Sequence, residues 1–204
     1  GGLPLVLVNG IHDPSPLPAI AIDLRAATAA AVRHLVTLGH RRIGMVVGPT
    51  RYSTSLEMIE GWRDATVRLS VSSDDSMISE TVFTFEGGQA GSAQLLEAGT
   101  TGIIAANDLM AAGVIAAVRA WGGMVPDVVS VIGFDGTPPM SYTSPRLTTM
   151  RQPIDRMSAA ATELLADAIG GNGVSQTQVF APELVVGRST GPVRETPGVP
   201  QLSA

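Results

Sequence analysis

The sequence predicts an α/β fold in which parallel sheets are flanked by helices. Apolar, β-branched runs alternate along the chain with segments of helical length and spacing, as in right-handed βαβ units. Several runs are nearly continuous, and residues 128–134 are the clearest case, which is typical of a strand buried on both faces. Polar residues follow the ends of these runs, where ligands bind in open parallel sheets.

Seven segments have the composition of strands. Residues that cannot continue a strand follow them, such as Gly48 and Pro49 after the second. The predicted strands are residues 5–8, 43–47, 77–83, 102–106, 128–134, 147–150 and 179–186.

Five segments between these strands repeat apolar residues at helical spacing. Gly39 and Gly122 stand just past the first and fourth of them, where a helix C-cap favours glycine. The predicted helices are residues 25–38, 54–69, 88–97, 109–121 and 156–169, with loops at 12–18 and 136–145 and a disordered tail at 191–204.

Glycine- and proline-containing breaks interrupt the chain at three places, residues 48–51, 136–145 and 170–173. A single cut between two domains would leave one such break. Three breaks predict a chain that passes repeatedly between two lobes.

Composition and charge exclude several classes of protein. The 204 residues carry a net charge of −5, the wrong sign for broad contact with phosphates, so this chain alone is not expected to hold DNA or RNA. No apolar run approaches the roughly 20 residues that span a bilayer, and the chain as given carries no export signal. The lack of Cys is compatible with a cytoplasmic protein. Every basic residue is Arg and there is no Cys, so lysine and thiol chemistry are absent.

Enzyme and metal motifs are also absent from the sequence. It contains no GxxxxGK[ST], GxSxG or HExxH motif, and His12, His34 and His40 lack metal-ligand spacing. The sequence therefore predicts neither catalysis nor a cofactor or metal.

Five polar residues follow predicted strands and are candidates for one binding cleft. Any one of them alone is explained as a cap or turn residue, and Asn107 or Asp108 is placed to cap the helix predicted to begin at Leu109. Together they favour a cleft for a small polar ligand, because amide and carboxylate groups hydrogen-bond hydroxyls in fixed directions. The five are Asn9, Thr50, Asn107, Asp135 and Gln152.

Aromatic residues make up only 4% of the chain, so Phe83 and Phe85 near the end of the third strand are notable. A ring at the edge of a cleft can stack on the apolar face of a sugar or on a base. Two rings two residues apart on a strand can equally well belong to the core, and the residues leave both readings open.

Four segments resemble the lactose-repressor/galactose-repressor (LacI/GalR) family of bacterial transcriptional regulators. They are LGHRRIGMVVGP (38–49), AANDLMAAGVIAAVRAWGGMVPDVVSVIGFDG (105–136), SPRLTTMRQP (144–153) and LVVGRST (184–190). The resemblance extends from about residue 5 to residue 190 with the segments in order.

The resemblance implies a two-lobed, periplasmic-binding-protein-like fold with an incomplete N-terminal lobe. That lobe would comprise residues 1–48 and 148–173, and the C-terminal lobe residues 49–147 and 174–190. The helix-turn-helix domain and about three strand–helix units of the family's N-terminal lobe have no counterpart here. Operator DNA would therefore be bound only through a domain absent from this chain, and the regulator would be a homodimer.

The resemblance also implies the residues that contact a small-molecule effector. They are Asn9, Phe83, Asn107, Asp135 and Gln152, with Phe85 as an alternative to Phe83. Many members carry an effector-binding arginine three residues before the Gly61-Trp62 pair, where this chain has Met58. Loss of that planar five-donor group weakens the assignment of a sugar and leaves a less polar or a differently shaped effector as the alternatives.

The expected function is the effector-sensing, dimerising core of a LacI-type regulator, a repressor that binds a sugar-like molecule between its lobes. The alternative is a periplasmic solute-binding protein of a sugar transporter, which shares the fold. An enzyme on an α/β scaffold is a remote third possibility because the motifs are missing.

Overall fold

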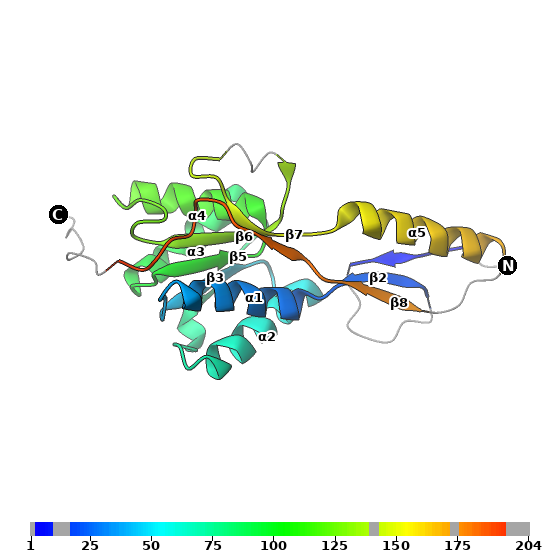
Figure 1. The fold of residues 1–204 in the computed structure, drawn as a ribbon, viewed down its shortest axis with the longest axis horizontal. Coiled ribbons are helices and arrows are strands. Elements are labelled where there is room, and N and C mark those ends of the chain that lie inside the picture. Colours follow the sequence, from blue (N-terminus) through cyan, green and yellow to red (C-terminus); the bar gives the residue numbers. More distant parts are fainter. Residues whose placement is uncertain (1–2, 10–16, 139–142, 172–175, 195–204) are drawn as a thin grey trace.

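The computed structural model describes residues 3–9, 17–138, 143–171 and 176–194 of the chain. These residues form a large lobe around a six-stranded sheet and a small lobe around a three-stranded sheet (Figure 1). The predicted α/β class with mainly parallel sheets is confirmed.

The large sheet has the strand order β4-β3-β5-β6-β7-β9. All neighbours are parallel except β7 and β9, which are antiparallel. The three central strands are almost completely buried, as their continuous apolar sequences require. The strands are β3 (Ile43–Val47), β4 (Ile78–Glu80), β5 (Gly102–Ala105), β6 (Ser130–Asp135), β7 (Thr148–Arg151) and β9 (Glu183–Val185).

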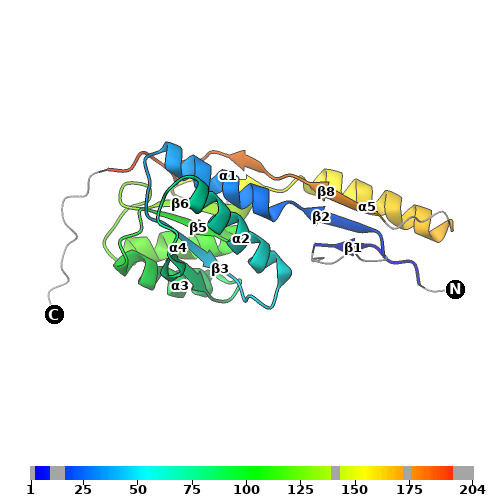
Figure 2. The ribbon, with the colours of Figure 1, turned by 90° about the horizontal axis from the view of Figure 1, so that it is seen from below.

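Four helices cover this sheet, two on each face (Figure 2). Helices α1 (Leu24–Thr37) and α2 (Ser53–Arg68) pack together on one face, and α3 (Phe85–Glu97) and α4 (Asp108–Ala120) pack together on the other. Trp62 and Phe134 are the largest fully buried side chains of the resulting core.

The small sheet has the order β1-β2-β8 and is parallel throughout. It consists of β1 (Leu7–Val8), β2 (Ala19–Ile22) and β8 (Thr177–Phe180), and α5 (Ile154–Ile169) packs against it (Figure 1). The buried face of α5 carries Met157, Ala160 and Leu164.

The chain crosses between the lobes three times, but not at the three predicted breaks. It crosses at Asp23 between β2 and α1, at Gln152–Pro153 between β7 and α5, and at Ala181–Pro182 between β8 and β9. The backbone N–H of Asp23 donates to the carbonyl of Phe180 across 3.0 Å, so the first and third crossovers lie side by side.

The strand pairing corrects the predicted lobe boundaries. Residues 24–48 were assigned to the N-terminal lobe, yet β3 pairs with β4 and β5 in the large sheet, and α1 packs on α2. Strand β7, within the predicted segment 148–173, also belongs to the large sheet, and β8, within 174–190, belongs to the small one. By sheet pairing the small lobe is 3–22 and 153–180, and the large lobe is 24–151 and 183–194, within the described residues.

Two strands differ from the prediction: one was missed, and one proved to be two strands. Strand β2 was not predicted, because its four residues AIAI directly follow the proline-containing segment. The single strand predicted over 179–186 is two strands in different sheets, because Pro182 lacks the N–H needed to continue a ladder. Most of the loop predicted at 12–18 lies outside the described residues.

The remaining differences concern segment ends. Helix α3 begins at Phe85 rather than Gly88, because Thr84 caps it by accepting a hydrogen bond from the N–H of Gly87. Part of the predicted disordered tail is ordered: Gly191 accepts a hydrogen bond from His40, and the N–H of Val193 donates to Leu38. Residues 195–204 of that tail lie outside the described part of the chain.

Candidate functional site

A cavity of about 210 Å³ lies between the two lobes and is lined by all five candidate residues that the resemblance implied. Asn9 after β1 and Ile22 at the end of β2 come from the small lobe, Gln152 after β7 lies at a crossover, and the remaining lining comes from the large lobe. The lining residues are Asn9, Ile22, Leu24, Thr54, Met58, Phe83, Ala106, Asn107, Phe134, Asp135 and Gln152.

Asn107 is held at the carboxyl end of β5 by its role as the N-cap of α4. Its side-chain oxygen accepts a hydrogen bond of 2.7 Å from the N–H of Met110. The cap reading and the site reading are therefore compatible: the oxygen is used by the helix, and the amide NH₂ is the group that Asn107 can offer to a ligand.

Asp135 is the last residue of β6, and its carboxylate accepts a 2.6 Å hydrogen bond from the side-chain amide of Gln152. Its backbone has a φ of 103°, a left-handed conformation that is uncommon for a residue other than glycine. Such strained residues concentrate at binding sites, where the surroundings enforce them.

The pKa of Asp135 is raised from 3.8 to about 7. Burial is the main cause, because it disfavours the charged carboxylate, and the negative charge of Asp108 adds to it. The hydrogen bonds from Gln152 and from the backbone N–H of Asp108 act in the opposite direction. Asp135 can therefore both donate and accept hydrogen bonds near neutral pH.

Phe83 lies in the segment between β4 and α3 rather than on a strand, and its side chain is 37% exposed. Its ring covers the Cα of Gly48, since a Cβ built there would lie 2.1 Å from the ring. The ring of Tyr52 packs beside it with a centroid distance of 5.9 Å. Phe83 thus presents a supported aromatic surface to the cavity.

The cavity also has an apolar wall. Met58 of α2 lies in it and is 3% exposed. Ile22, Leu24 and Phe134 extend this apolar lining. Asn9, which directly follows β1, takes a left-handed backbone conformation with a φ of 52°, which asparagine tolerates better than most residues.

Two other residues singled out in the sequence do not line the cavity. Thr50 uses its backbone N–H and its hydroxyl to bind the carboxylate of Glu80, both at 3.0 Å, at the end of the neighbouring strand. Phe85 is the first residue of α3. Sequence reasoning missed Ile22 and Leu24, which are apolar, and Thr54, which belongs to no motif; the three reach the cavity only through a crossover and α2.

The arrangement suits hydrogen bonding to a small ligand with an apolar face. Asn9, Asn107, Asp135 and Gln152 supply donors and acceptors, and Met58 and Phe83 supply apolar contact. Within the part of the chain that is described, no group of three or more His, Asp or Glu residues could hold a metal ion. None of the helices among the described residues is long and apolar enough to cross a bilayer.

Residues 32–190 match the family described as the periplasmic binding protein-like domain, and this match covers most of the chain. The fold and the interlobe cavity agree with that class of ligand-binding core. An uncharacterised HTH-type transcriptional regulator in the aml 5′ region of Streptomyces limosus is 44% identical over 193 residues, 93% of this chain. The HTH-type transcriptional regulator MalR of Streptomyces coelicolor is 42% identical over 194 residues, also 93% of this chain.

Solved structures agree with the sequence relatives. A regulatory protein of the LacI family from Chloroflexus aggregans has a TM-score of 0.85 at 30% identity, covering 92% of this chain and 69% of that one. The chain belongs to the LacI family of transcriptional regulators, and it is the effector-binding core of that family. It spans about half the length of the curated relatives, 55% and 56% of the two named above.

Two further solved relatives contain sugars. The transcriptional regulator CelR in complex with cellobiose has a TM-score of 0.83 at 28% identity, covering 89% of this chain and 58% of that chain. A LacI family regulator from Enterococcus faecium with bound ribose has a TM-score of 0.86 at 27% identity, covering 94% and 72%.

Proposed function

We propose that this chain is the effector-sensing and dimerising core of a bacterial repressor, and that it binds a small sugar-like molecule between its lobes. The observation that carries the proposal is the interlobe cavity, in which residues from widely separated parts of the sequence offer polar groups to one small volume. The family membership and the two sugar-bound relatives support the same class of ligand.

The mechanism is a shift between two arrangements of the lobes. A ligand changes such an equilibrium only if it binds one arrangement better than the other. Asn9 lies on the small-lobe side of the cavity, whereas Asn107 and Asp135 lie on the large-lobe side, so a ligand that contacts both sides favours the arrangement in which it can do so. That difference is transmitted to operator affinity as a coupling free energy.

DNA contact belongs to a helix-turn-helix domain outside this chain, in a homodimer that acts in the cytoplasm. The net charge of −5 supports this division, because a surface of that sign does not attract phosphates. The core itself has no catalytic role, in keeping with relatives that are regulators.

The alternative of a periplasmic solute-binding protein shares the fold and would use the same cavity. Membership in a family of transcriptional regulators disfavours it. Met58 favours an effector with a larger apolar surface than a sugar bound through an arginine would need, because a thioether offers no hydrogen-bond donor at that place.

The test is a calorimetric screen of the full-length protein against maltose, cellobiose, ribose, nucleosides and polyols. For a ligand found in this way, we expect Asp135→Ala and Asn107→Ala each to weaken binding by about tenfold or more, the effect of losing a hydrogen bond to a charged or buried group. Asp75→Ala removes an exposed carboxylate paired with Arg63, far from the cavity lining, and serves as the control. Unchanged affinity in both site variants would overturn the assignment.

A further inference from the structure

Asp108 is a buried carboxylate beside the cavity that does not line it. It is the first residue of α4 and is 1% exposed. The sequence made it one of two candidate N-caps, but in the structure Asn107 is the cap and Asp108 lies in the first turn, where an acidic residue is favourable near the positive end of the helix dipole. Its contacts go well beyond that role.

Both oxygens of this carboxylate are used by segments distant in the sequence. Oδ1 accepts a 2.6 Å hydrogen bond from the hydroxyl of Thr149 on β7. Oδ2 accepts hydrogen bonds from the backbone N–H of Thr137, at 2.8 Å, and from its hydroxyl, at 3.1 Å. One side chain therefore joins the start of α4, the turn after β6 and strand β7.

The three joined segments are the ones that carry the polar side of the cavity. Asn107 directly precedes Asp108, Asp135 lies two residues before Thr137, and Gln152 lies three residues after Thr149. The fit is tight, because a Cβ added to Gly133 of β6 would lie 2.5 Å from Oδ1 of Asp108.

Burying the carboxylate of Asp108 costs free energy, and a buried carboxylate is normally paired with a cation that offsets this cost. The charge of Asp108 instead acts on Asp135, a second acidic group, and raises its pKa. Arg151 stands opposite Asp135 in the strand register, but its guanidinium is paired with Glu183. Among the described residues, the hydrogen bonds to Asp108 come only from threonines and the backbone.

We propose that Asp108 is the positioning residue of the effector site, which fixes Asn107, Asp135 and Gln152 relative to one another and keeps Asp135 able to donate a hydrogen bond. The proposal rests on the proposed function for the identity of the site, and on the three hydrogen bonds for the mechanism. A carboxylate suits this place because its two oxygens accept all of these hydrogen bonds, including the one from the backbone N–H of Thr137, which can only donate.

The charge of Asp108 affects a measurable quantity, the pKa of Asp135, that a purely steric role would leave unchanged. It contributes to the raised pKa of Asp135, so its removal should lower that pKa. The pKa of Asp108 itself is raised by burial, and the hydrogen bonds from its threonine partners offset part of that rise. The titration of Asp135 therefore reports on Asp108 without any ligand.

The first experiment follows the carboxyl carbon of Asp135 by NMR as the pH changes in the ligand-free protein, with Asp135→Asn identifying the signal. In Asp108→Asn we expect the pKa of Asp135 to fall toward its ordinary value. An unchanged pKa in a folded Asp108→Asn variant would overturn the proposal. Because no effector is present, this result does not depend on whether the proposed function is right.

The second experiment uses two variants that differ by a hydroxyl group. Thr149→Val removes the donor to Asp108 with little change in shape, and Thr149→Ser keeps it. We expect Thr149→Val to shift the side-chain amide signal of Gln152 and to weaken the binding of the sugar found in the screen by about tenfold. Thr149→Ser should match the wild type in both. Equal behaviour of the two variants would contradict the proposal, and an amide shift without any sugar binding would contradict only the proposed function.

Discussion

The side-chain amide of Gln152 donates a hydrogen bond of 2.6 Å to the carboxylate of Asp135, and its backbone N–H donates to the Asp135 carbonyl across 3.1 Å. The two residues stand at the ends of adjacent strands, and Gln152 is the last residue before the crossover into α5. Each side chain keeps hydrogen-bonding capacity beyond this contact, with which a ligand can bond. A ligand bound there lies beside the place where the chain leaves the large lobe.

The raised pKa of Asp135 predicts a pH-dependent stability. Its folded-state pKa of about 7 lies above the ordinary 3.8, so its contribution to stability is fully present below about pH 4 and is lost as the pH rises through 7. In Asp135→Asn this dependence is absent. Urea denaturation should show the variant gaining stability relative to the wild type, by an amount on the order of a few kcal/mol, between pH 4 and 8. A difference that stays constant with pH would contradict the assigned pKa.

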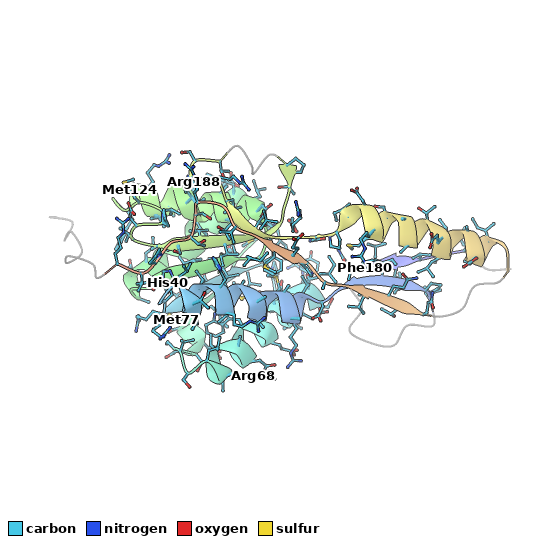
Figure 3. All side chains as sticks on the ribbon, in the orientation of Figure 1. His40, Arg68, Met77, Met124, Phe180 and Arg188 are labelled. Atoms are coloured by element: carbon cyan, nitrogen blue, oxygen red, sulfur yellow. The ribbon has the colours of Figure 1, made fainter. Side chains whose placement is uncertain are left out.

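His40 predicts the opposite dependence at the far end of the large lobe (Figure 3). It is buried, with Nε2 bound to the carbonyl of Gly191 and Nδ1 bound to the hydroxyl of Thr101. Burial is the main cause that lowers its pKa below 6.5, so the stability it contributes is present above that pH and is lost as the pH falls through the lower folded-state value.

The comparison of wild type with His40→Gln tests this directly, because glutamine does not titrate. We expect the melting temperature of the wild type to fall more steeply than that of the variant between pH 7 and 5. Asp135 titrates in both proteins, so its effect cancels in the comparison. The replacement also removes the repulsion between His40 and His34, which is part of the effect measured. Parallel curves would show that His40 does not control acid stability.

Gly136 is predicted to be intolerant of a side chain for two separate reasons. Its φ is +70°, and an added Cβ would lie 2.6 Å from the Cβ of Arg151. Gly122 has a φ of +89° with nothing within 4 Å, so Gly122→Ala isolates the backbone cost, about 1 kcal/mol. We expect Gly136→Ala to cost roughly 1–3 kcal/mol more in chemical denaturation. Equal costs would mean that the strand end relaxes around the methyl group.

The contact between Gly48 and Phe83 predicts an indirect effect on binding. A methyl group at residue 48 would displace the Phe83 ring, which is free to move outward because it is partly exposed. Gly48→Ala and Phe83→Ala should therefore each weaken binding of the sugar identified in the screen, and the double variant should be no worse than the poorer single one. Additive losses in calorimetry would show that the two residues act separately.

The sequence alone determined the fold class and the order of most elements. Continuous apolar runs and helical spacing are local signals, so the central strands β3, β5 and β6 and the helices between them were predicted near their observed positions. The family was recognised from contiguous segments, and the five residues transferred from it converge on one cavity, although their contact with an effector stays a prediction.

Only the tertiary structure decided which sheet each short segment joins. Strand β2 pairs with β8, more than 150 positions later in the chain, so no local pattern carries this information. Asp108 shows the same limit within the site. In the sequence it is a candidate helix cap beside Asn107, whereas its proposed role follows from threonines on other segments. Local propensity determines the elements, whereas distant pairing and burial determine the crossovers and the site.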